Sequence, residues 1–417
     1  MLTRCRMSNG NGARNRVAGL IILGNFLQSI SVGINAIIFT TALSSYGAST
    51  ALIGFILAIE FLSVFAISLG LPRLLKLFSL SAGLEISLLF RVPALIALCY
   101  TTDSRWWLLW VFLHGVGNFL YGILLQTWIN GIDFGKNKGL VMGLFGTSIS
   151  LGLAIGPLIL ALMTHRPDVL APLMASIEVF LKQQLAIEIP ATVSALTKTG
   201  LVLSAAFSAI CAVPTLLCRF NTPKPVLSID VSVRTLIALS PAAYFAVMLC
   251  GFTILGLQSF ITLYGIKNGL DVASASYLMT AFMLGSITLE APIASLSDRF
   301  DRRYVIIVLV LLGLVSAIYL PIVVYWRWPA WILLFFWGGM MGAVFSICLA
   351  LISERFEGDR IVVANGAFSI MDNLGGLIGV LVMGIAMDYL GEDGFPYALM
   401  LASISYFTFA LTRYRVQ

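Results

Sequence analysis

The chain has 417 residues, of which 59% are hydrophobic and 11% are charged, and its mean hydropathy is +0.99. A soluble globular protein is nearer half apolar and about a quarter charged, so the composition excludes that class. The net charge of +6 does not indicate nucleic-acid binding, because the basic residues are scattered in loops as membrane topology requires. Long apolar runs recur along the chain, and the short alternating segments of an outer-membrane barrel are not seen.

These runs predict an all-α fold, a polytopic membrane protein with about 12 transmembrane helices. The first run is too long for a signal-peptide core and lacks a following cleavage pattern, so we expect it to be a retained span. The expected spans are residues 17–43, 50–71, 80–100, 106–129, 139–163, 196–218, 235–264, 273–296, 303–325, 328–352, 362–388 and 395–412.

The basic residues indicate the orientation of these spans. Most of the 25 Lys and Arg residues fall in the termini and in the loops on the same side of the membrane as the termini. Because cytoplasmic loops carry the excess of Lys and Arg, both termini are expected in the cytoplasm. The connection over residues 164–195 is then on the outer side, where its mixed amphipathicity predicts a surface helix, as a lid or as a decoration.

The six cysteines do not indicate a disulfide framework or a metal centre. Most of them fall inside expected spans, and the sequence has neither a CxxC motif nor a Cys/His cluster. We therefore expect no cofactor and no metal.

Three glycines of the fifth expected span coincide with glycines of the eleventh when the chain is shifted by 223 residues. Gly143 then meets Gly366, Gly152 meets Gly375, and Gly156 meets Gly379. The sequence thus predicts two six-helix pseudo-repeats, residues 1–218 and 235–417, joined by a cytoplasmic linker at 219–234. Parallel repeats of this kind are a transporter architecture.

The stretch "ASLSDRFDRRY", which begins at Ala294, resembles the loop motif of the major facilitator superfamily. In that motif a small residue is followed four positions later by Asp-Arg and then by a Gly-Arg-Arg/Lys group. Asp301 replaces the second glycine here, and the matching charges are Asp298, Arg299, Arg302 and Arg303. The resemblance implies that these charges form and break ion pairs between helix ends as the halves rock. The alternative is that they only mark the cytoplasmic side.

Other stretches match the superfamily in part. The first-half copy of the loop motif keeps Gly70 but has Leu74 where Asp is expected. "GLAIGP" resembles an element associated with exporters, and its Gly152, Gly156 and Pro157 alternatively serve close helix packing. "QTWIN", which begins at Gln126, looks like a branch of bacterial inner-membrane permeases, which implies that membrane as the location.

Polar residues inside the spans are the candidates for substrate binding, because such residues usually face the protein interior. Gln28, Ser31 and Asn35, with Gly24, share one helix face in the first span, and the fourth span carries a similar stripe. In the superfamily, the first, fourth, seventh and tenth spans line the central cavity. Interhelical hydrogen bonding is the alternative. The remaining candidates are His114, Asn118, Tyr121, Tyr244, Gln258 and Trp337.

Three charges are expected near the middle of the membrane. Glu60 and Arg91 each lie about 10 residues from the outer ends of consecutive spans, so we expect them to form a pair. The pair either neutralises two expensive charges or acts as a proton-sensitive latch. Asp372 has no basic partner at its depth, so it either carries a proton or is a hydrogen-bonded acid between helices.

The leading interpretation is a secondary active transporter that moves a small molecule by alternating access, with proton coupling as an option. The candidate cavity has no cluster of Arg or Lys, which favours an uncharged or amphipathic substrate. A sensor or scaffold that keeps the transporter fold and, less favoured, a lipid-acting membrane enzyme are the alternatives. The expected partners are the substrate, membrane lipids and protons, with no nucleic acid, and we expect a monomer.

Overall fold

The computed structural model describes residues 11–132, 134, 138–165, 172, 175–176, 193–217, 239–297, 299–355 and 359–414. Within these ranges the regular structure is helical, and 12 helical segments are long and apolar enough to cross a membrane. Each predicted span corresponds to one of them, which confirms the predicted all-α membrane fold. The helices are α1 (Asn11–Ser45), α2 (Thr50–Leu77), α3 (Leu80–Leu98), α4 (Ser104–Gly131), α5 (Lys138–His165), α7 (Ala195–Ile210), α8 (Ala212–Leu217), α10 (Pro241–Lys267), α11 (Val272–Leu296), α12 (Arg302–Val323), α13 (Arg327–Arg355), α14 (Asp359–Leu390) and α15 (Gly394–Tyr414).

The sixth span differs from the prediction because it is interrupted. A turn at Cys211 separates α7 from α8, and Pro214 follows within the first turn of α8. Proline has no backbone N–H and its ring clashes with the carbonyl four residues earlier, here that of Ile210. The continuous helix therefore ends at Ile210, and the N–H of Cys211 instead bonds to carbonyls of the last turn of α7.

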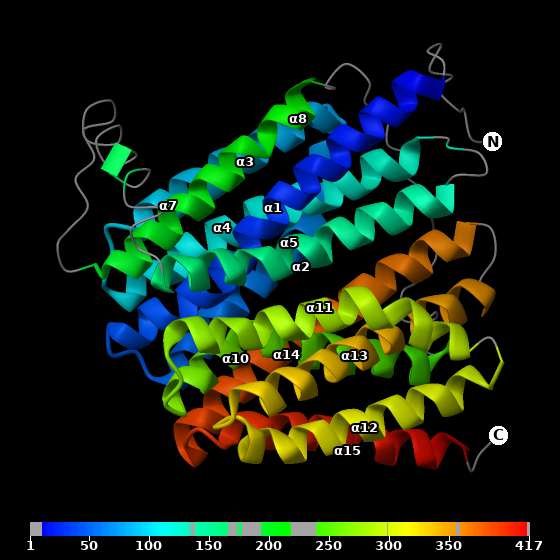
Figure 1. Ribbon diagram of the computed structural model, residues 1–417. Helices are drawn as coiled ribbons and strands as arrows, with labels where there is room; N and C mark the ends of the chain where they lie inside the picture. Colours follow the sequence, from blue (N-terminus) through cyan, green and yellow to red (C-terminus); the bar gives the residue numbers. More distant parts are fainter. Residues whose placement is uncertain are drawn as a thin grey trace. The chain divides into compact units, whose positions relative to one another are not determined.

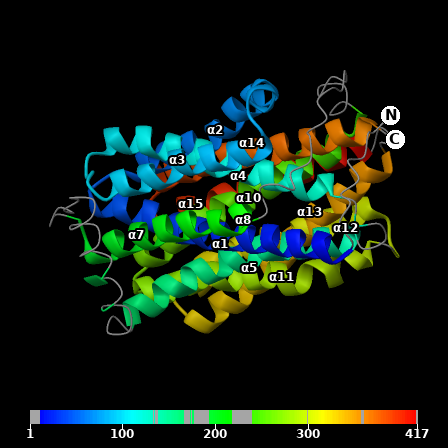
Figure 2. The same cartoon turned by 90° about the horizontal axis from the view of Figure 1, so that it is seen from above.

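The structure forms two compact units. Unit 1 comprises Met1–Ile38, Leu62–Gly156 and Arg166–Leu227, and unit 2 comprises Phe39–Phe61, Pro157–His165 and Ser228–Gln417. In unit 2 the helices α10 to α15 run alongside one another (Figures 1 and 2). The predicted halves 1–218 and 235–417 stay predictions, and the predicted linker lies outside the described residues.

The predicted glycine repeat corresponds to the same helix contact in both units. A Cβ at Gly152 of α5 would lie 2.7 Å from the carbonyl oxygen of Phe26 in α1, and one at Gly375 of α14 would lie 2.0 Å from that of Met248 in α10. Gly156 and Gly379 meet α1 and α10 one turn later. Only glycine allows the backbones to approach this closely. The fifth and eleventh spans thus pack on the first and seventh in the same way.

Two turns repeat as well. Gly47 after α1 and Gly269 after α10 have φ of 80° and 86°, a conformation that glycine adopts without strain. At each turn the glycine N–H bonds three residues back and the next N–H bonds five residues back. This is the Schellman arrangement, which satisfies the last carbonyls of the helix.

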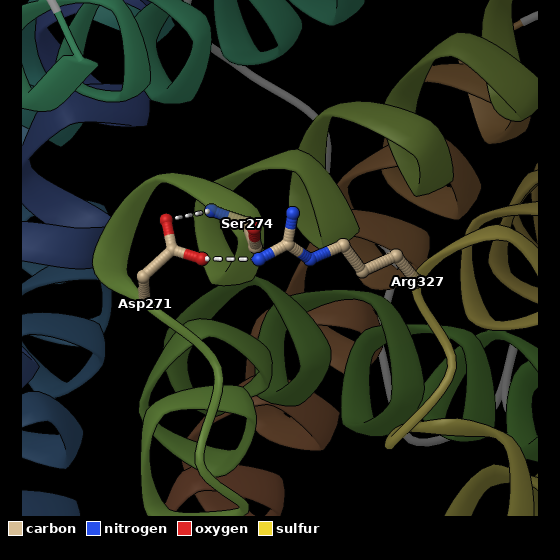
Figure 3. A network of polar contacts seen from close by, with 3 residues as sticks. All are labelled: Asp271, Ser274 and Arg327. Atoms are coloured by element: carbon tan, nitrogen blue, oxygen red, sulfur yellow. Dashed lines mark hydrogen bonds and ion pairs between the residues drawn. The ribbon is translucent and has the colours of Figure 1, made fainter.

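The N-terminus of α11 is held by a small polar network, shown in Figure 3. The carboxylate of Asp271 accepts a hydrogen bond from the Ser274 N–H at 3.2 Å. It also forms an ion pair with Arg327 Nη2 at 3.2 Å. Hydrogen bonds from Ser274 lower the pKa of the Asp271 carboxyl most, and the charge of Arg327 lowers it further. The network joins the start of α11 to the start of α13.

Replacing Asp271 by alanine is expected to lower the free energy of unfolding by about 1 kcal/mol, the usual loss for a helix cap. The exposed ion pair adds less than this. Because the folded pKa is lowered, the charged form stabilises the fold above about pH 4, and this contribution disappears as the pH falls further. Thermal unfolding at pH 3 and pH 7 would measure both effects. Asp271→Asn keeps a capping oxygen and should lose little, as should Arg327→Gln. Equal unfolding temperatures for Asp271→Ala and Asp271→Asn would contradict the role of the cap.

Candidate substrate site and intramembrane charges

The polar stripes of the first and fourth spans face each other inside unit 1. The side-chain amide of Gln28 in α1 donates to Asn118 Oδ1 in α4 at 2.6 Å, and also to the Asn118 carbonyl oxygen at 3.2 Å. Two turns along, Asn35 Nδ2 lies 3.1 Å from His114 Nε2. An amide nitrogen can only donate, so this hydrogen bond uses His114 Nε2 as the acceptor. We call these four residues, Gln28, Asn35, His114 and Asn118, the amide–histidine cluster.

Three of the four residues of this cluster are buried, and two of these three have acceptor oxygens without a hydrogen-bond partner. Gln28, Asn35 and His114 are 6%, 3% and 1% exposed. Gln28 Oε1 and Asn35 Oδ1 have no hydrogen-bond partner among the described residues. A buried polar atom without a partner is costly, typically about 1–3 kcal/mol. The two oxygens are therefore suited to accept hydrogen bonds from a hydroxyl or N–H group of a bound molecule.

Ser31 and Tyr121, which were predicted in the same stripes, form interhelical hydrogen bonds, and their role in substrate binding stays a prediction. The Ser31 hydroxyl lies 2.7 Å from Ser204 Oγ and 2.9 Å from Ser208 Oγ, both in α7. The Tyr121 hydroxyl donates to the Cys211 carbonyl oxygen at the turn between α7 and α8. Of the residues on this predicted face, Gln28 and Asn35 contact α4, whereas Ser31 contacts α7. For these two residues the interhelical alternative describes the observed contacts.

Arg91 is fully buried in unit 1 without a carboxylate among its observed partners. Its Nη2 donates to the Ser208 carbonyl oxygen at 3.1 Å and to Cys211 Sγ at 3.0 Å. The guanidinium carbon lies 4.5 Å from the centroid of the Tyr121 ring, which is a cation–π contact. Its Nε and Nη1 have no hydrogen-bond partner in the described part of the chain. Glu60 belongs to unit 2, so the predicted Glu60–Arg91 pair stays a prediction.

The repeat gives unit 2 an apolar counterpart of the amide–histidine cluster. A shift of 222 places Gln28 of α1 on Cys250 of α10, and a shift of 223 places Asn118 of α4 on Met341 of α13. The Cys250 thiol lies 3.9 Å from the Met341 carbonyl oxygen, which repeats the Gln28–Asn118 contact. The shift of 223 also places His114 on Trp337.

The other predicted binding residues of unit 2 are buried. Trp337 is 1% exposed and packs beside Gly313 of α12. The Tyr244 hydroxyl donates to the Ala364 carbonyl oxygen, and Gln258 lies within α10. These three residues belong to unit 2, and the contacts described for Trp337 and Tyr244 lie within that unit.

An intramembrane acid that the sequence reasoning missed lies between α11 and α13. Glu290 accepts hydrogen bonds from the hydroxyls of Ser346 and Ser286. Gly342 leaves room for it, because a Cβ there would lie 2.8 Å from Glu290 Oε2. A search of the predicted span 273–296 for charged residues would have found it.

Asp372, the predicted acid of the eleventh span, lies in α14 where its backbone meets α10. A Cβ at Gly251 would lie 1.9 Å from the Asp372 carbonyl oxygen. Neither Glu290 nor Asp372 forms an ion pair with a described residue. In addition to Glu60, unit 2 therefore holds the carboxyl groups of Glu290 and Asp372 within its spans.

The loop motif is partly described. Arg302, at the start of α12, pairs with Glu354 near the end of α13 at 2.8 Å, and Asp301 caps α12. Arg299 and Arg303 are exposed. Asp298 and most of the connection 164–195 lie outside the described residues. The surroundings of Gly70 and Leu74 are also not described. The motif's role in conformational change stays a prediction.

Comparisons with known proteins agree with this architecture. The Major Facilitator Superfamily model matches residues 243–416. YfkF, an uncharacterized MFS-type transporter of Bacillus subtilis (strain 168), is 23% identical over 398 residues, which are 92% of this chain and 90% of the relative.

Among solved structures, a mutant of the nucleoside transporter NupG aligns with a TM-score of 0.72 at 14% identity, over 95% of this chain and 99% of its own. A bacterial homolog of the human lysosomal transporter Spinster, in an inward-facing and occupied conformation, aligns with a TM-score of 0.73 at 14% identity, over 98% and 97%. The resemblance predicted from the sequence is thereby confirmed: residues 243–416 match the Major Facilitator Superfamily model, and nearly the whole chain is similar to transporters in sequence or in fold.

Proposed function

We propose that the protein is a secondary active transporter that moves a small molecule across the cytoplasmic membrane of a bacterium by alternating access. It acts as a monomer with both termini in the cytoplasm, the side to which its basic loops are assigned. The observation that carries the proposal is the amide–histidine cluster of unit 1. Hydrogen-bonding groups at membrane depth are expensive and mark substrate pathways in transporters.

The chemistry of the cluster favours an uncharged substrate with several hydroxyl or N–H groups. Gln28 and Asn35 offer buried acceptor oxygens, which would attract donors and repel a carboxylate or phosphate. A buried cation of the same unit, Arg91, contacts Ser208, Cys211 and the ring of Tyr121. Nucleosides and sugars fit this description, and one solved neighbour in fold is a nucleoside transporter.

Proton coupling is the second part of the proposal. Glu290 and Asp372 are carboxyl groups within spans, with no cationic partner among the described residues. In a low-dielectric environment a carboxyl group binds a proton more readily than in water, so either group could exchange a proton during the cycle. A proton gradient across proteoliposomes should then drive uptake, and a proton ionophore should abolish it.

The test starts from a thermal-shift screen of the purified protein against nucleosides, sugars, amino acids, organic acids and amphipathic drugs. A ligand of the folded state raises the unfolding temperature by mass action. We expect stabilisation by one uncharged class and its loss in Asn35→Ala and Gln28→Ala. Ser31→Ala is the matched control in the same helix, because its hydroxyl bonds to α7. The hit is then measured for uptake into proteoliposomes. Binding without uptake would favour a sensor or scaffold, and a hit that keeps its shift in both amide variants would overturn the proposed site.

A further inference from the structure

A cavity of about 470 Å³ lies at one end of unit 2, and it is lined by none of the residues of the amide–histidine cluster. It is formed by the starts of α10 and α12 and the ends of α13 and α15. Its volume falls in the range of about 300–1,000 Å³ that small-molecule sites occupy. Because these four helices are membrane spans, the cavity lies where the spans meet the aqueous boundary.

One wall of the cavity is the uncapped N-terminus of α10. Ser240 is the N-cap residue, but its side chain makes no capping hydrogen bond although the residue is only 8% exposed. Pro241 follows, and the next two amides, of Ala242 and Ala243, precede the first intrahelical donor at Tyr244. The start of a helix combines unpaired N–H groups with a positive partial charge, which together suit an anion. The buried Ser240 hydroxyl points to the same use, since it lines the cavity without a described partner.

Two guanidinium groups line the same cavity. Arg303 comes from the first turn of α12 and Arg355 from the last turn of α13. Glu354 also lines the cavity, but its carboxylate is held by Arg302 at 2.8 Å. The charged side chains of the lining therefore carry a net positive charge next to the N-terminus of α10. Planar guanidinium groups bind phosphate oxygens through paired hydrogen bonds.

The remaining wall is apolar. Ile306, Ile307 and Leu351 line it together with Leu239, which is 46% exposed at the edge of the cavity. Phe300 and Tyr304, just before and within the start of α12, are also more than half exposed. In a membrane-spanning unit, exposed apolar residues at this depth contact acyl chains. The cavity thus joins a cationic end to an apolar side that is open to lipid.

We propose that this cavity binds an anionic phospholipid, with the headgroup phosphate at Ser240, Arg303 and Arg355 and an acyl chain along the isoleucine wall. A free phosphate ion would satisfy only the polar end. In the predicted orientation the cavity faces the cytoplasmic leaflet, where anionic lipids attract basic residues. The site is separate from substrate binding and does not depend on the proposed substrate.

The test measures binding of short-chain phosphatidylglycerol to the purified full chain in a non-ionic detergent, by calorimetry and by thermal shift. Short-chain phosphatidylcholine and inorganic phosphate are the comparison ligands. We expect phosphatidylglycerol to bind most tightly. The Arg303→Gln/Arg355→Gln double variant should lose about tenfold or more in affinity, because a charge-assisted hydrogen bond contributes more than the free energy of one decade.

Arg299→Gln is the matched control, since Arg299 is an exposed basic residue of the same loop that does not line the cavity. Its affinity for phosphatidylglycerol should be unchanged. Ser240→Ala removes no charge and tests the helix end if the double variant fails to fold. Equal binding of phosphatidylcholine, equal binding of inorganic phosphate, or an equal loss in Arg299→Gln would each overturn the proposal.

Discussion

Replacing Gly285 or Gly338 by alanine is expected to destabilise unit 2 severely. A Cβ at Gly285 of α11 would lie 1.7 Å from the Phe335 carbonyl oxygen of α13, and one at Gly338 of α13 would lie 1.9 Å from the Phe282 carbonyl oxygen of α11. The obstructing atoms belong to the backbone, so no side-chain rotation relieves the clash and the two helices must separate. Overpacking usually costs about 1–3 kcal/mol, and a backbone clash should reach or exceed the upper end.

Thermal unfolding and the yield of monodisperse protein would measure this loss. The matched control is Gly366→Ala in α14, because a Cβ there meets no atom within 4 Å. Gly366→Ala should unfold at or above the wild-type temperature, since alanine favours a helix more than glycine does. If Gly285→Ala and Gly366→Ala unfolded at the same temperature, the close α11–α13 approach would be disproved.

Replacing Arg91 by methionine is expected to raise stability and to reduce transport. The guanidinium is fully buried, yet Nε and Nη1 have no described partner, so its desolvation is only partly offset. Replacing buried charges by apolar residues of similar volume is often neutral or stabilising by about 1–4 kcal/mol. Transport should fall because Arg91 fixes Tyr121 and the turn at Cys211, which sit beside the first span.

Unfolding temperature and substrate uptake, measured on the same preparations, would separate the two effects. Arg91→Lys keeps the charge but loses the planar fork and the stacking, so it should be less stable than Arg91→Met. Combining Arg91→Met with Glu60→Gln tests the predicted pair between these two residues. If Glu60 balances the charge of Arg91, Arg91→Met alone will destabilise the protein and Glu60→Gln/Arg91→Met will restore it. An unstable Arg91→Met that Glu60→Gln fails to restore would contradict both readings of this arginine.

The spans were predictable because lipid leaves few choices. A backbone in hydrocarbon must satisfy its hydrogen bonds within itself, so each long apolar run becomes a helix. The interruption of the sixth span at Cys211 was not predicted, although Pro214 within that span indicates it. The glycine spacing was also informative, since glycines such as Gly152 and Gly375 are required where two backbones touch.

The site was predictable only in part, because periodicity assigns residues to a helix face and not to a neighbour. Gln28 and Asn35 were correctly placed on one face, but Ser31 between them bonds to α7 because each helix contacts several others. The partners of Arg91 come from two segments that are distant from it and from each other in sequence, Tyr121 in α4 and the Ser208–Cys211 turn at the end of α7. The cavity at Ser240 combines the ends of four helices, and no linear motif describes it.

The unequal repeat has a practical consequence for redesign. Hydrogen-bonding capacity is concentrated at positions 28, 35, 114 and 118. In unit 2, the positions that correspond to 28, 118 and 114 carry the thiol of Cys250, the thioether of Met341 and the indole of Trp337. A combinatorial library restricted to those four codons varies the whole proposed substrate site while leaving the glycine contacts of both units intact. New substrate selectivity should therefore be obtainable by mutating one half of the gene and selecting for transport, with the sequence of the other half unchanged.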